Sequence, residues 1–407
     1  MSSTTRHSGT VRLGIVGYGN QGSIYARALS RAEVPGMVIG AIADADPARR
    51  AAAGQDHPGV PTYADSLELI RSGDVDAVVT TLPHFQHVEI GLAALDHGLH
   101  VLVEKPVGVH VEQAQRLVDR ASERPDLVFA VMFNQRTNPL YQKVREIVAG
   151  GEIGEIRRST WVITTWWRPQ GYYDSSAWRA TWGGEGGGVL VNQAPHQLDL
   201  WQWICGMPDE VVARLGNGVG RDIAVENEVA VLASYANGAT GQFVTATNDL
   251  VGTDRFEIVG TRGRVVVTDS ARATVSRLTD DEEAISARFD VAASRRLFAG
   301  EIDLTELWTT EELAFESAWG SQHNAVLANF AAAVLRGEPL IAPGADGLAG
   351  VRLANAIHHS GWTGRWVPTS LDPDEFLTAL NAQIRHEGRF PEQAPGSQGA
   401  ALDGAGR

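Results

Sequence analysis

The segment VRLGIVGYGNQGSIYARALSRA, residues 11–32, decides the fold of this chain. Its apolar run Val11–Val16 predicts a buried β-strand, and the glycine-rich turn GYGNQG follows at residues 17–22. The amphipathic run Gln21–Ala32 then predicts a helix. A glycine turn between a buried strand and a helix is typical of the first unit of a doubly wound parallel sheet.

The alternation of strands and helices continues outward from this segment to about Met132. The apolar runs show no polar alternation, so both faces of each strand are expected to be buried, as in a parallel sheet. We therefore predict an α/β domain of the Rossmann type over residues 11–132. Its further strands are predicted at Met37–Ala43, Asp76–Thr80, His100–Val103 and Leu127–Met132, and its further helices at His87–His97, at Glu112–Ala121 and from Pro47.

The three glycines of the turn suit a dinucleotide. Gly17 allows the tight turn, Gly19 lets the backbone approach a pyrophosphate, and Gly22 allows close packing of helix on strand. The phosphate would lie at the helix N-terminus, where unpaired N–H groups and the helix dipole favour an anion. Asp44 closes the second strand, at the spacing expected of an acid that binds the ribose hydroxyls and repels a 2′-phosphate. This predicts NAD rather than NADP; the alternative is an ordinary glycine turn, with Asp44 or Asp46 as a helix cap.

Lys105 follows the strand His100–Val103 at its carboxyl end, the edge that faces the ligand crevice in open parallel sheets. Pro106 restricts the backbone there, so the lysine is expected to be held in one direction. A bound, positively charged nicotinamide would lower the pKa of Lys105 and suit it to proton transfer. The alternative is a surface lysine in a turn. The candidate cofactor contacts are Gly17, Tyr18, Gly19, Asn20, Gln21, Gly22, Asp44, Leu82, Pro83, His87, Glu104 and Lys105.

The pattern changes after Met132, where hairpin-like pairs of strands replace the strand–helix alternation. We predict a second, α+β domain over residues 133–390, with a large, mostly antiparallel open sheet and helices on one face. Residues 279–318 are acidic and irregular and are expected to form a surface excursion or an arm, and residues 1–10 and 391–407 to be disordered. The predicted strands are Glu155–Trp166, Glu226–Tyr235, Ala239–Ala246, Phe256–Val259 and Arg264–Thr268, and the predicted helices are Pro139–Val148, Gln322–Leu335 and Gly347–His358.

A second polar cluster lies in the run GGGVLVNQAPHQLD, residues 186–199. Asn192 and His196 are four residues apart, a spacing that places side chains on one helix face. A histidine with a pKa near about 6.5 suits removal of an alcohol proton. The alternatives are that Asn192 caps the helix and that His196 is a structural histidine.

Aromatic residues gather just before this cluster. Four of the 11 tryptophans, Trp166, Trp167, Trp178 and Trp182, lie close together with Tyr172, Tyr173 and Arg179. Flat rings stack on the apolar faces of a pyranose, while arginine and phenol groups bond its hydroxyls. The alternative is that these rings form a subunit interface or the edge of the core. The candidate substrate contacts are Gln135, Arg136, Tyr172, Tyr173, Trp178, Arg179, Asn192 and His196.

Together these motifs resemble the glucose–fructose oxidoreductase and inositol dehydrogenase family (Gfo/Idh/MocA), over about residues 11–385. The resemblance implies a Rossmann domain followed by an open sheet through which subunits often assemble, so a homodimer or homotetramer is expected. It also implies that Lys105 binds the substrate hydroxyl and that His196 is the general base and acid, with Asn192 a third catalytic candidate. Many members have aspartate at the position of Asn192, and an amide cannot carry that charge. The run from Tyr172 to His196 is more similar to sugar-acting branches, although Ala180 replaces their usual glycine.

Composition restricts the partners. The net charge of −15 would repel nucleic acid and anionic lipid, and the chain has no apolar run long enough to span a membrane. A single cysteine and the lack of a signal-peptide pattern favour the cytoplasm. We assign no metal ligands.

We therefore predict an NAD-dependent dehydrogenase that oxidises a secondary hydroxyl of a sugar or glycoside. Three alternatives stay open: an inositol dehydrogenase, an enzyme that cleaves glycosides through transient oxidation and elimination, and a non-catalytic sensor of NAD or sugar.

Overall fold

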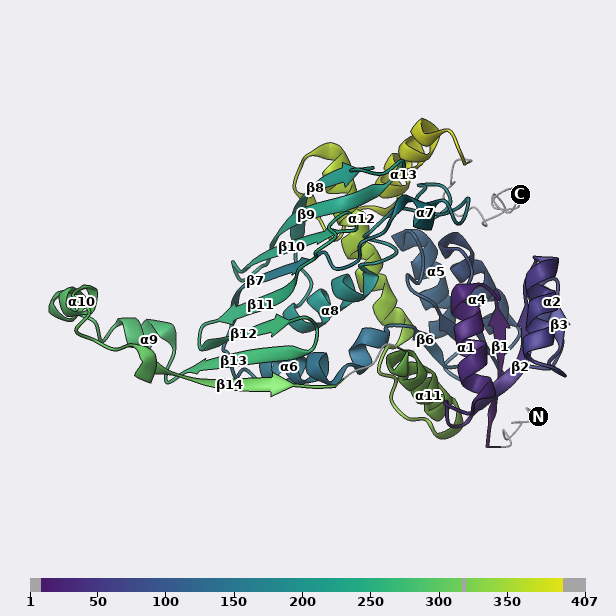
Figure 1. Ribbon diagram of the computed structural model, residues 1–407, viewed down its shortest axis with the longest axis horizontal. Coiled ribbons are helices and arrows are strands. Elements are labelled where there is room, and N and C mark those ends of the chain that lie inside the picture. Colours follow the sequence, from purple (N-terminus) through teal and green to yellow (C-terminus); the bar gives the residue numbers. More distant parts are fainter. Residues whose placement is uncertain (1–8, 317–319, 391–407) are drawn as a thin grey trace.

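The computed structural model describes residues 9–316 and 320–390, and it contains two sheets that lie side by side (Figure 1). The first sheet has six strands and comes from the N-terminal third of the chain. The second has nine strands and comes from the rest. The predicted fold class, a Rossmann domain followed by a mostly antiparallel open sheet, is confirmed.

The first sheet is wholly parallel, in the order β3-β2-β1-β4-β5-β6. The direction of winding reverses between β1 and β4, so a crevice opens at the carboxyl ends of these strands. The strands are β1 (Val11–Val16), β2 (Met37–Ala43), β3 (Thr62–Tyr63), β4 (Ala77–Thr80), β5 (His100–Val103) and β6 (Phe129–Val131). The helices are α1 (Asn20–Ser30), α2 (Pro47–Asp56), α3 (Ser66–Arg71), α4 (His87–Asp96) and α5 (Val111–Ser122).

One helix that covers the first sheet comes from far along the chain. Helix α11 (Ser321–Arg336) places Val326, Leu327 and Phe330 in the same apolar cluster as Leu13 of β1. Residues 11–132 therefore do not complete their own hydrophobic core, and the C-terminal half of the chain returns to finish it.

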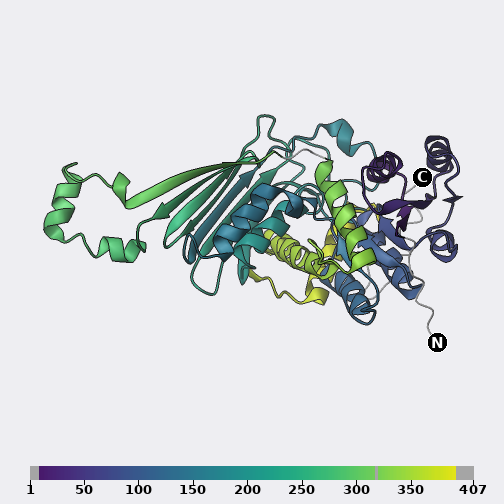
Figure 2. The same cartoon turned by 90° about the horizontal axis from the view of Figure 1, so that it is seen from below.

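The second sheet has the order β14-β13-β12-β11-β7-β10-β9-β8-β15, and its neighbours are antiparallel except β7 and β10. Helices α6 (Pro139–Ala149), α8 (Pro195–Cys205) and α12 (Gly347–Thr363) pack against one face (Figure 2). Along β9, Val229 and Val231 are buried whereas Leu232 is half exposed, as expected when one face is covered. The strands are β7 (Ile156–Ile163), β8 (Glu210–Asn217), β9 (Glu226–Ser234), β10 (Thr240–Ala246), β11 (Asp254–Gly260), β12 (Gly263–Thr268), β13 (Arg272–Leu278), β14 (Trp308–Ala314) and β15 (Val367–Pro368).

The prediction of an irregular excursion over residues 279–318 is wrong in part. Strand β14 (Trp308–Ala314) closes the sheet edge against β13, and α9 (Glu282–Ser286) with α10 (Val291–Phe298) forms an arm that projects from the body (Figure 1). Since β14 is an exposed edge strand, it carries charges where a buried strand would be apolar, and these charges hid it in the sequence.

Several other boundaries differ from the predictions. The sequence pattern missed β8, β13 and the helix α13 (Pro373–Glu387), and β7 ends at Ile163 rather than Trp166. The predicted disordered tail at residues 391–407, and most of the predicted N-terminal one, lie outside the described residues. Among the helices that the structure describes, none has both the length and the apolar character to cross a membrane.

Candidate functional site

The glycine turn after β1 is closed on its inner side and open toward the crevice. Gly17 has a φ of +102°, which favours glycine, and a Cβ on Gly22 would lie 2.0 Å from the carbonyl oxygen of Gly17. A Cβ on Gly19 would approach nothing closer than Nη1 of Arg49, at 3.8 Å. The backbone at Gly19 can therefore receive a ligand group that a side chain there would displace.

Helix α1 presents its N-terminus at this turn. Its N-cap residue is Gly19, and no side chain of the described part of the chain caps the first turn. The N–H groups of that turn can therefore bind an anion, as a dinucleotide site requires.

Asp44 lies beside the turn at the carboxyl end of β2. Its carboxylate accepts hydrogen bonds from the backbone N–H groups of Tyr18, at 2.7 Å, and Asp46, at 2.8 Å. Asp46 rather than Asp44 caps the next helix, because its side chain accepts from the N–H of Ala48. Asp44 is thus a fixed carboxylate that helix capping does not account for, and the turn and Asp44 together fit the pyrophosphate and ribose of NAD.

The remaining predicted cofactor residues lie around the loops that follow β4 and β5. His87 is buried, and its two ring nitrogens lie 2.8 Å from the carbonyl oxygens of Leu82 and Pro106, a position that favours a role in joining these loops. Glu104 is also buried and accepts hydrogen bonds from the Tyr25 phenol and from the N–H of Lys105. Burial raises the pKa of Glu104, and the charge of Lys105 opposes that rise.

Lys105 joins the two halves of the molecule. Its Nζ donates to the backbone carbonyl oxygen of Asn192 at 2.7 Å. Burial lowers the pKa of Lys105, while the carboxyl groups of Glu104 and Glu185 raise it. The lysine at the end of the Rossmann strand therefore contacts the segment that leads into α8. The spacing of the two motifs in the sequence does not by itself show this contact.

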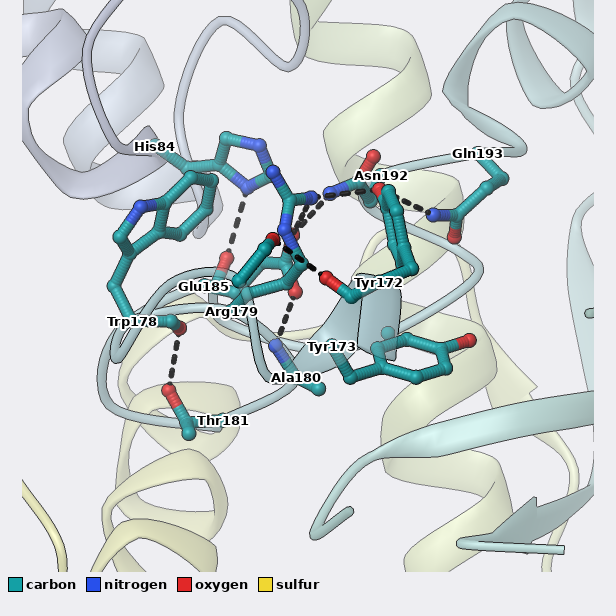
Figure 3. A network of polar contacts seen from close by, with 12 residues as sticks. His84, Tyr172, Tyr173, Trp178, Arg179, Ala180, Thr181, Glu185, Asn192 and Gln193 are labelled. Carbon is teal, nitrogen blue, oxygen red and sulfur yellow. Dashed lines mark hydrogen bonds and ion pairs between the residues drawn. The ribbon is translucent and has the colours of Figure 1, made fainter. Parts of the chain in front are cut away.

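Asn192 is neither on a helix face nor at a cap, in contrast to the prediction. Helix α8 begins at Pro195 and its N-cap residue is Ala194, so Asn192 lies in the preceding turns. The four-residue spacing to His196 therefore does not act through a helix. Instead, the Asn192 side-chain amide donates to the carboxylate of Glu185 (Figure 3).

His196 lies in the first turn of α8 and is 8% exposed. Its Nδ1 atom is buried and has no hydrogen-bond partner within the described part of the chain. Burial lowers its pKa well below the ordinary value, and the charges of Lys105 and His323 lower it further. His196 is therefore neutral at physiological pH, and an unpaired polar atom in such a site indicates that a ligand or water completes it.

Sequence reasoning missed Glu185, which lies at the centre of the polar network drawn in Figure 3. Its carboxylate accepts from the N–H of Ala180 at 2.6 Å and from the Asn192 amide, and Nη1 of Arg179 lies 3.7 Å away. Its carbonyl oxygen lies 2.9 Å from Nδ1 of His84. Burial raises the pKa of Glu185 to about 7. Three of these partners lie within seven residues of Glu185, but His84 comes from the distant loop after β4, and the sequence pattern does not show that the carboxylate is buried.

His323, on α11, was also missed. It is buried, its ring lies 6.1 Å from that of Tyr25, and burial together with the charge of Lys105 lowers its pKa to about 4. In the ranges 9–316 and 320–390 no group of three or more His, Cys, Asp or Glu residues could hold a metal ion.

Part of the aromatic segment lies against this network. The guanidinium of Arg179 lies over the rings of Tyr172 and Trp178, at 4.5 and 4.9 Å from their centres. The Tyr172 phenol oxygen accepts from Nη1 of Arg179 at 2.7 Å and from Nε2 of Gln193 at 3.2 Å. The edge of Trp178 meets His84. The cluster combines aromatic rings with hydroxyl-binding groups, which are side-chain types that suit a carbohydrate.

Other predicted residues lie elsewhere. Tyr173 points away from Arg179 and bonds Thr247 at 2.6 Å (Figure 3). Arg136 is buried in ion pairs with Asp199, at 2.7 Å, and Asp346, at 2.5 Å, which favours a structural role. Gln135 donates to Gln322 at 2.6 Å. Within the aromatic run, Trp182 is buried in the core.

Comparison with known proteins extends this picture. Residues 11–132 match the oxidoreductase family with an NAD-binding Rossmann fold, and residues 141–266 match the GFO/IDH/MocA C-terminal domain. Inositol 2-dehydrogenase 3 of Saccharopolyspora erythraea is 31% identical over 268 residues, which cover 65% of this chain and 75% of that relative. Levoglucosan dehydrogenase of Pseudarthrobacter phenanthrenivorans is 27% identical over 289 residues, 63% of this chain and 73% of that relative.

Solved structures show the same fold. Levoglucosan dehydrogenase in complex with NADH and levoglucosan aligns with a TM-score of 0.72 at 22% identity, over 89% of this chain and 100% of that chain. The WlbA dehydrogenase from Bordetella pertussis in complex with NADH and UDP-GlcNAcA aligns with a TM-score of 0.71 at 23% identity, over the same shares of 89% and 100%. With its dinucleotide turn, its fixed Asp44 and both family domains, this chain belongs to the GFO/IDH/MocA family of NAD-dependent oxidoreductases.

Proposed function

We propose that this enzyme oxidises a secondary hydroxyl of a pyranose sugar or glycoside. The observation that carries the proposal is the contact between Lys105 Nζ and the carbonyl oxygen of Asn192 at 2.7 Å. This contact brings the carboxyl edge of the NAD-binding sheet to the turn before α8, close to neutral His196. An ammonium and a neutral imidazole near the cofactor edge are what the oxidation of an alcohol needs.

His196 and Lys105 have different roles at the hydroxyl group of the substrate. Bound NAD supplies the hydride acceptor, so the carbinol carbon loses its hydrogen with the electron pair. His196 takes the hydroxyl proton, which it can do because burial keeps its imidazole uncharged. Lys105 stabilises the negative charge that grows on the oxygen as the proton leaves. The alcohol would become a ketone, with its hydroxyl proton held by His196 and its carbon-bound hydrogen lost as the hydride that bound NAD would accept.

The cluster of Tyr172, Trp178 and Arg179 supports a pyranose substrate. The guanidinium is already aligned over both rings, and the Tyr172 phenol oxygen is fixed by two donors, so the groups are ordered before a ligand arrives. Pre-ordered groups reduce the entropy lost when a flexible, polar sugar binds.

An inositol is the second candidate substrate, because relatives such as the 31% identical protein of Saccharopolyspora erythraea carry the name inositol 2-dehydrogenase. Inositols share the ring of secondary hydroxyls but lack the ring oxygen and the anomeric carbon. We also expect a homodimer or homotetramer built on the open face of the nine-stranded sheet, which light scattering of the purified chain can measure.

The test is a screen for NADH formation with free pyranoses, glycosides and inositols at mildly alkaline pH. We expect turnover with at least one pyranose or glycoside, and a loss of at least about 100-fold in kcat for His196→Ala with that substrate. Lys105→Ala should lower kcat similarly. Turnover with inositols alone would assign the second substrate class. Near wild-type turnover in both variants, or no turnover with any compound despite tight NAD binding, would refute the proposal.

A further inference from the structure

The residue before the glycine triplet supplies a negative charge to the loop that carries Asn192. Asn192 lies at the tip of Lys105 but carries an amide, which has no charge at any pH. Glu185, seven residues earlier, is the carboxylate bonded to that amide. At 2% exposed it is as deeply buried as a core residue, which is rare for glutamate unless its charge is used or paired.

Both oxygens of Glu185 are occupied by protein groups. One accepts from the N–H of Ala180 at 2.6 Å, and the other accepts from the Asn192 amide and lies 3.7 Å from Nη1 of Arg179. Although each oxygen could accept a second hydrogen bond, the side chain is only 2% exposed, so the surrounding protein shields it from a substrate hydroxyl. Glu185 can therefore act on the reaction only through its neighbours.

Glu185 acts on Lys105 in two ways. The Asn192 amide is bonded to Glu185 while the carbonyl oxygen of the same residue accepts from Lys105 Nζ, so one residue links the two charges. The carboxylate also acts on the ammonium directly through its electric field.

We propose that Glu185 is the positioning carboxylate of this active site, which keeps Lys105 charged and aimed, both through Asn192 and through its own negative charge. The charge lies on the segment before Gly186 instead of at position 192, and the Asn192 amide relays its effect. Only the kinetic test of this inference depends on the proposed function.

Other ionisable groups also act on this pair and have to be held constant. Glu104 faces Lys105 from the end of β5 but is bonded to Tyr25, so it contributes a fixed opposite charge. The remaining groups that act on Lys105 or Glu185, or on which Lys105 acts, are Arg168, Arg179, His84, His87, His196 and His323. The tests below leave all of these groups unchanged.

The first test measures the charge of Lys105 without any turnover. The chain contains two lysines, Lys105 and Lys143, so protein made with lysine carrying ¹³C at the ε carbon gives two signals, which Lys143→Arg assigns. In the wild-type protein, the Lys105 signal should show a second inflection as Glu185 ionises. In Glu185→Gln the pKa of Lys105 should fall by about one unit, whereas the Lys143 signal should be the same in both proteins.

The second test moves the charge instead of deleting it. In Glu185→Gln the new side chain has one acceptor oxygen for two donors, so its NH2 group faces either the Asn192 amide or the N–H of Ala180 donor to donor. In Glu185→Gln with Asn192→Asp the hydrogen bond is restored in the opposite direction, and the carboxylate now lies at position 192. We expect the double variant to recover most of the Lys105 pKa and at least about tenfold in kcat/KM over the single variant, with the alkaline limb of the pH profile returning toward that of the wild type.

The matched control is Glu226→Gln. Glu226 is a fully buried carboxylate that accepts from the N–H groups of Gly188 and Leu190 on the same loop, so it supports the loop without a link to Lys105. This variant should lower thermal stability and leave the Lys105 titration in place. If Glu185→Gln behaves as Glu226→Gln does, or if the wild-type Lys105 signal titrates in a single step, the inference is overturned. Because the titration needs no substrate, failure of the proposed function would leave this outcome readable.

Discussion

The cofactor turn and the substrate-side network are built in opposite ways. Residues 17–22 are contiguous, and their shape depends on backbone atoms and on missing Cβ atoms, as at Gly22. The network around Glu185 draws on the loop after β4, the end of β5, the segment before α8 and α8 itself, and it depends on charged side chains. The first region is therefore sensitive to added volume, and the second to added or lost charge.

The largest effect should come from the histidine that receives the proton. We expect His196→Ala to lower kcat by about 10²- to 10⁴-fold and to leave NAD affinity within about twofold, because the loss falls on chemistry and not on the cofactor turn. Steady-state kinetics and calorimetric titration of NAD measure the two quantities. A large loss of NAD affinity would show that the cofactor turn and the substrate-side network do not act separately.

Two matched substitutions in the glycine turn each add one methyl group. Gly22→Ala places a Cβ 2.0 Å from a carbonyl oxygen and should destabilise the fold by about 3 kcal/mol. Gly19→Ala meets only the end of Arg49, at 3.8 Å, so the fold should lose less than about 0.5 kcal/mol while NAD affinity falls at least about tenfold. Urea unfolding and NAD titration separate these outcomes. Equal destabilisation by both variants would show that the turn is not open toward the crevice.

Glu185 should make stability depend on pH. Its folded pKa is raised from 4.5 to about 7, so its contribution is fully present below pH 4.5 and is lost as the pH rises through about 7. Relative to Glu185→Gln, the wild-type protein should lose about 2 to 3 kcal/mol of unfolding free energy between about pH 5 and about pH 8. Urea unfolding of both proteins at the two pH values gives the difference. A difference that does not change with pH would show that Glu185 ionises as easily in the native state as in the unfolded chain.

The smallest predicted effect distinguishes the roles of the neighbouring residues Tyr172 and Tyr173. Tyr172→Phe removes the acceptor for Arg179 and Gln193 and should raise KM for the sugar by about three- to tenfold, with kcat nearly unchanged. Tyr173→Phe removes a bond to Thr247 and should lower the melting temperature without changing KM. A larger KM effect from Tyr173→Phe would place the substrate on the other side of the segment.

Local patterns predicted most of the Rossmann elements within one or two residues, including β2 (Met37–Ala43) and β5 (His100–Val103). They succeeded because buried parallel strands are uniformly apolar and contrast with the helices between them. They failed at β14 (Trp308–Ala314), where an exposed edge strand resembles a loop in composition, and at α13 (Pro373–Glu387).

The candidate site was predicted in the same uneven way. Lys105 and His196 were recognised because each follows a marked motif, a strand end and a glycine triplet. Glu185 and His323 were not, since no motif marks either residue and their surroundings include the distant residues His84 and Lys105. Arg136 and Tyr173 are close in sequence to motifs of the site, but their side chains bond Asp199 and Thr247, respectively.

The order of residues was sufficient for the fold class and for the cofactor turn, because strand, turn, helix and acid interact with near neighbours and follow fixed spacings. The folded chain was needed to show that the carboxylate next to Asn192 belongs to Glu185 and that Lys105 reaches across to the second domain. Electrostatic interactions depend on distance and burial, and neither quantity is set until the two halves of the chain pack against each other.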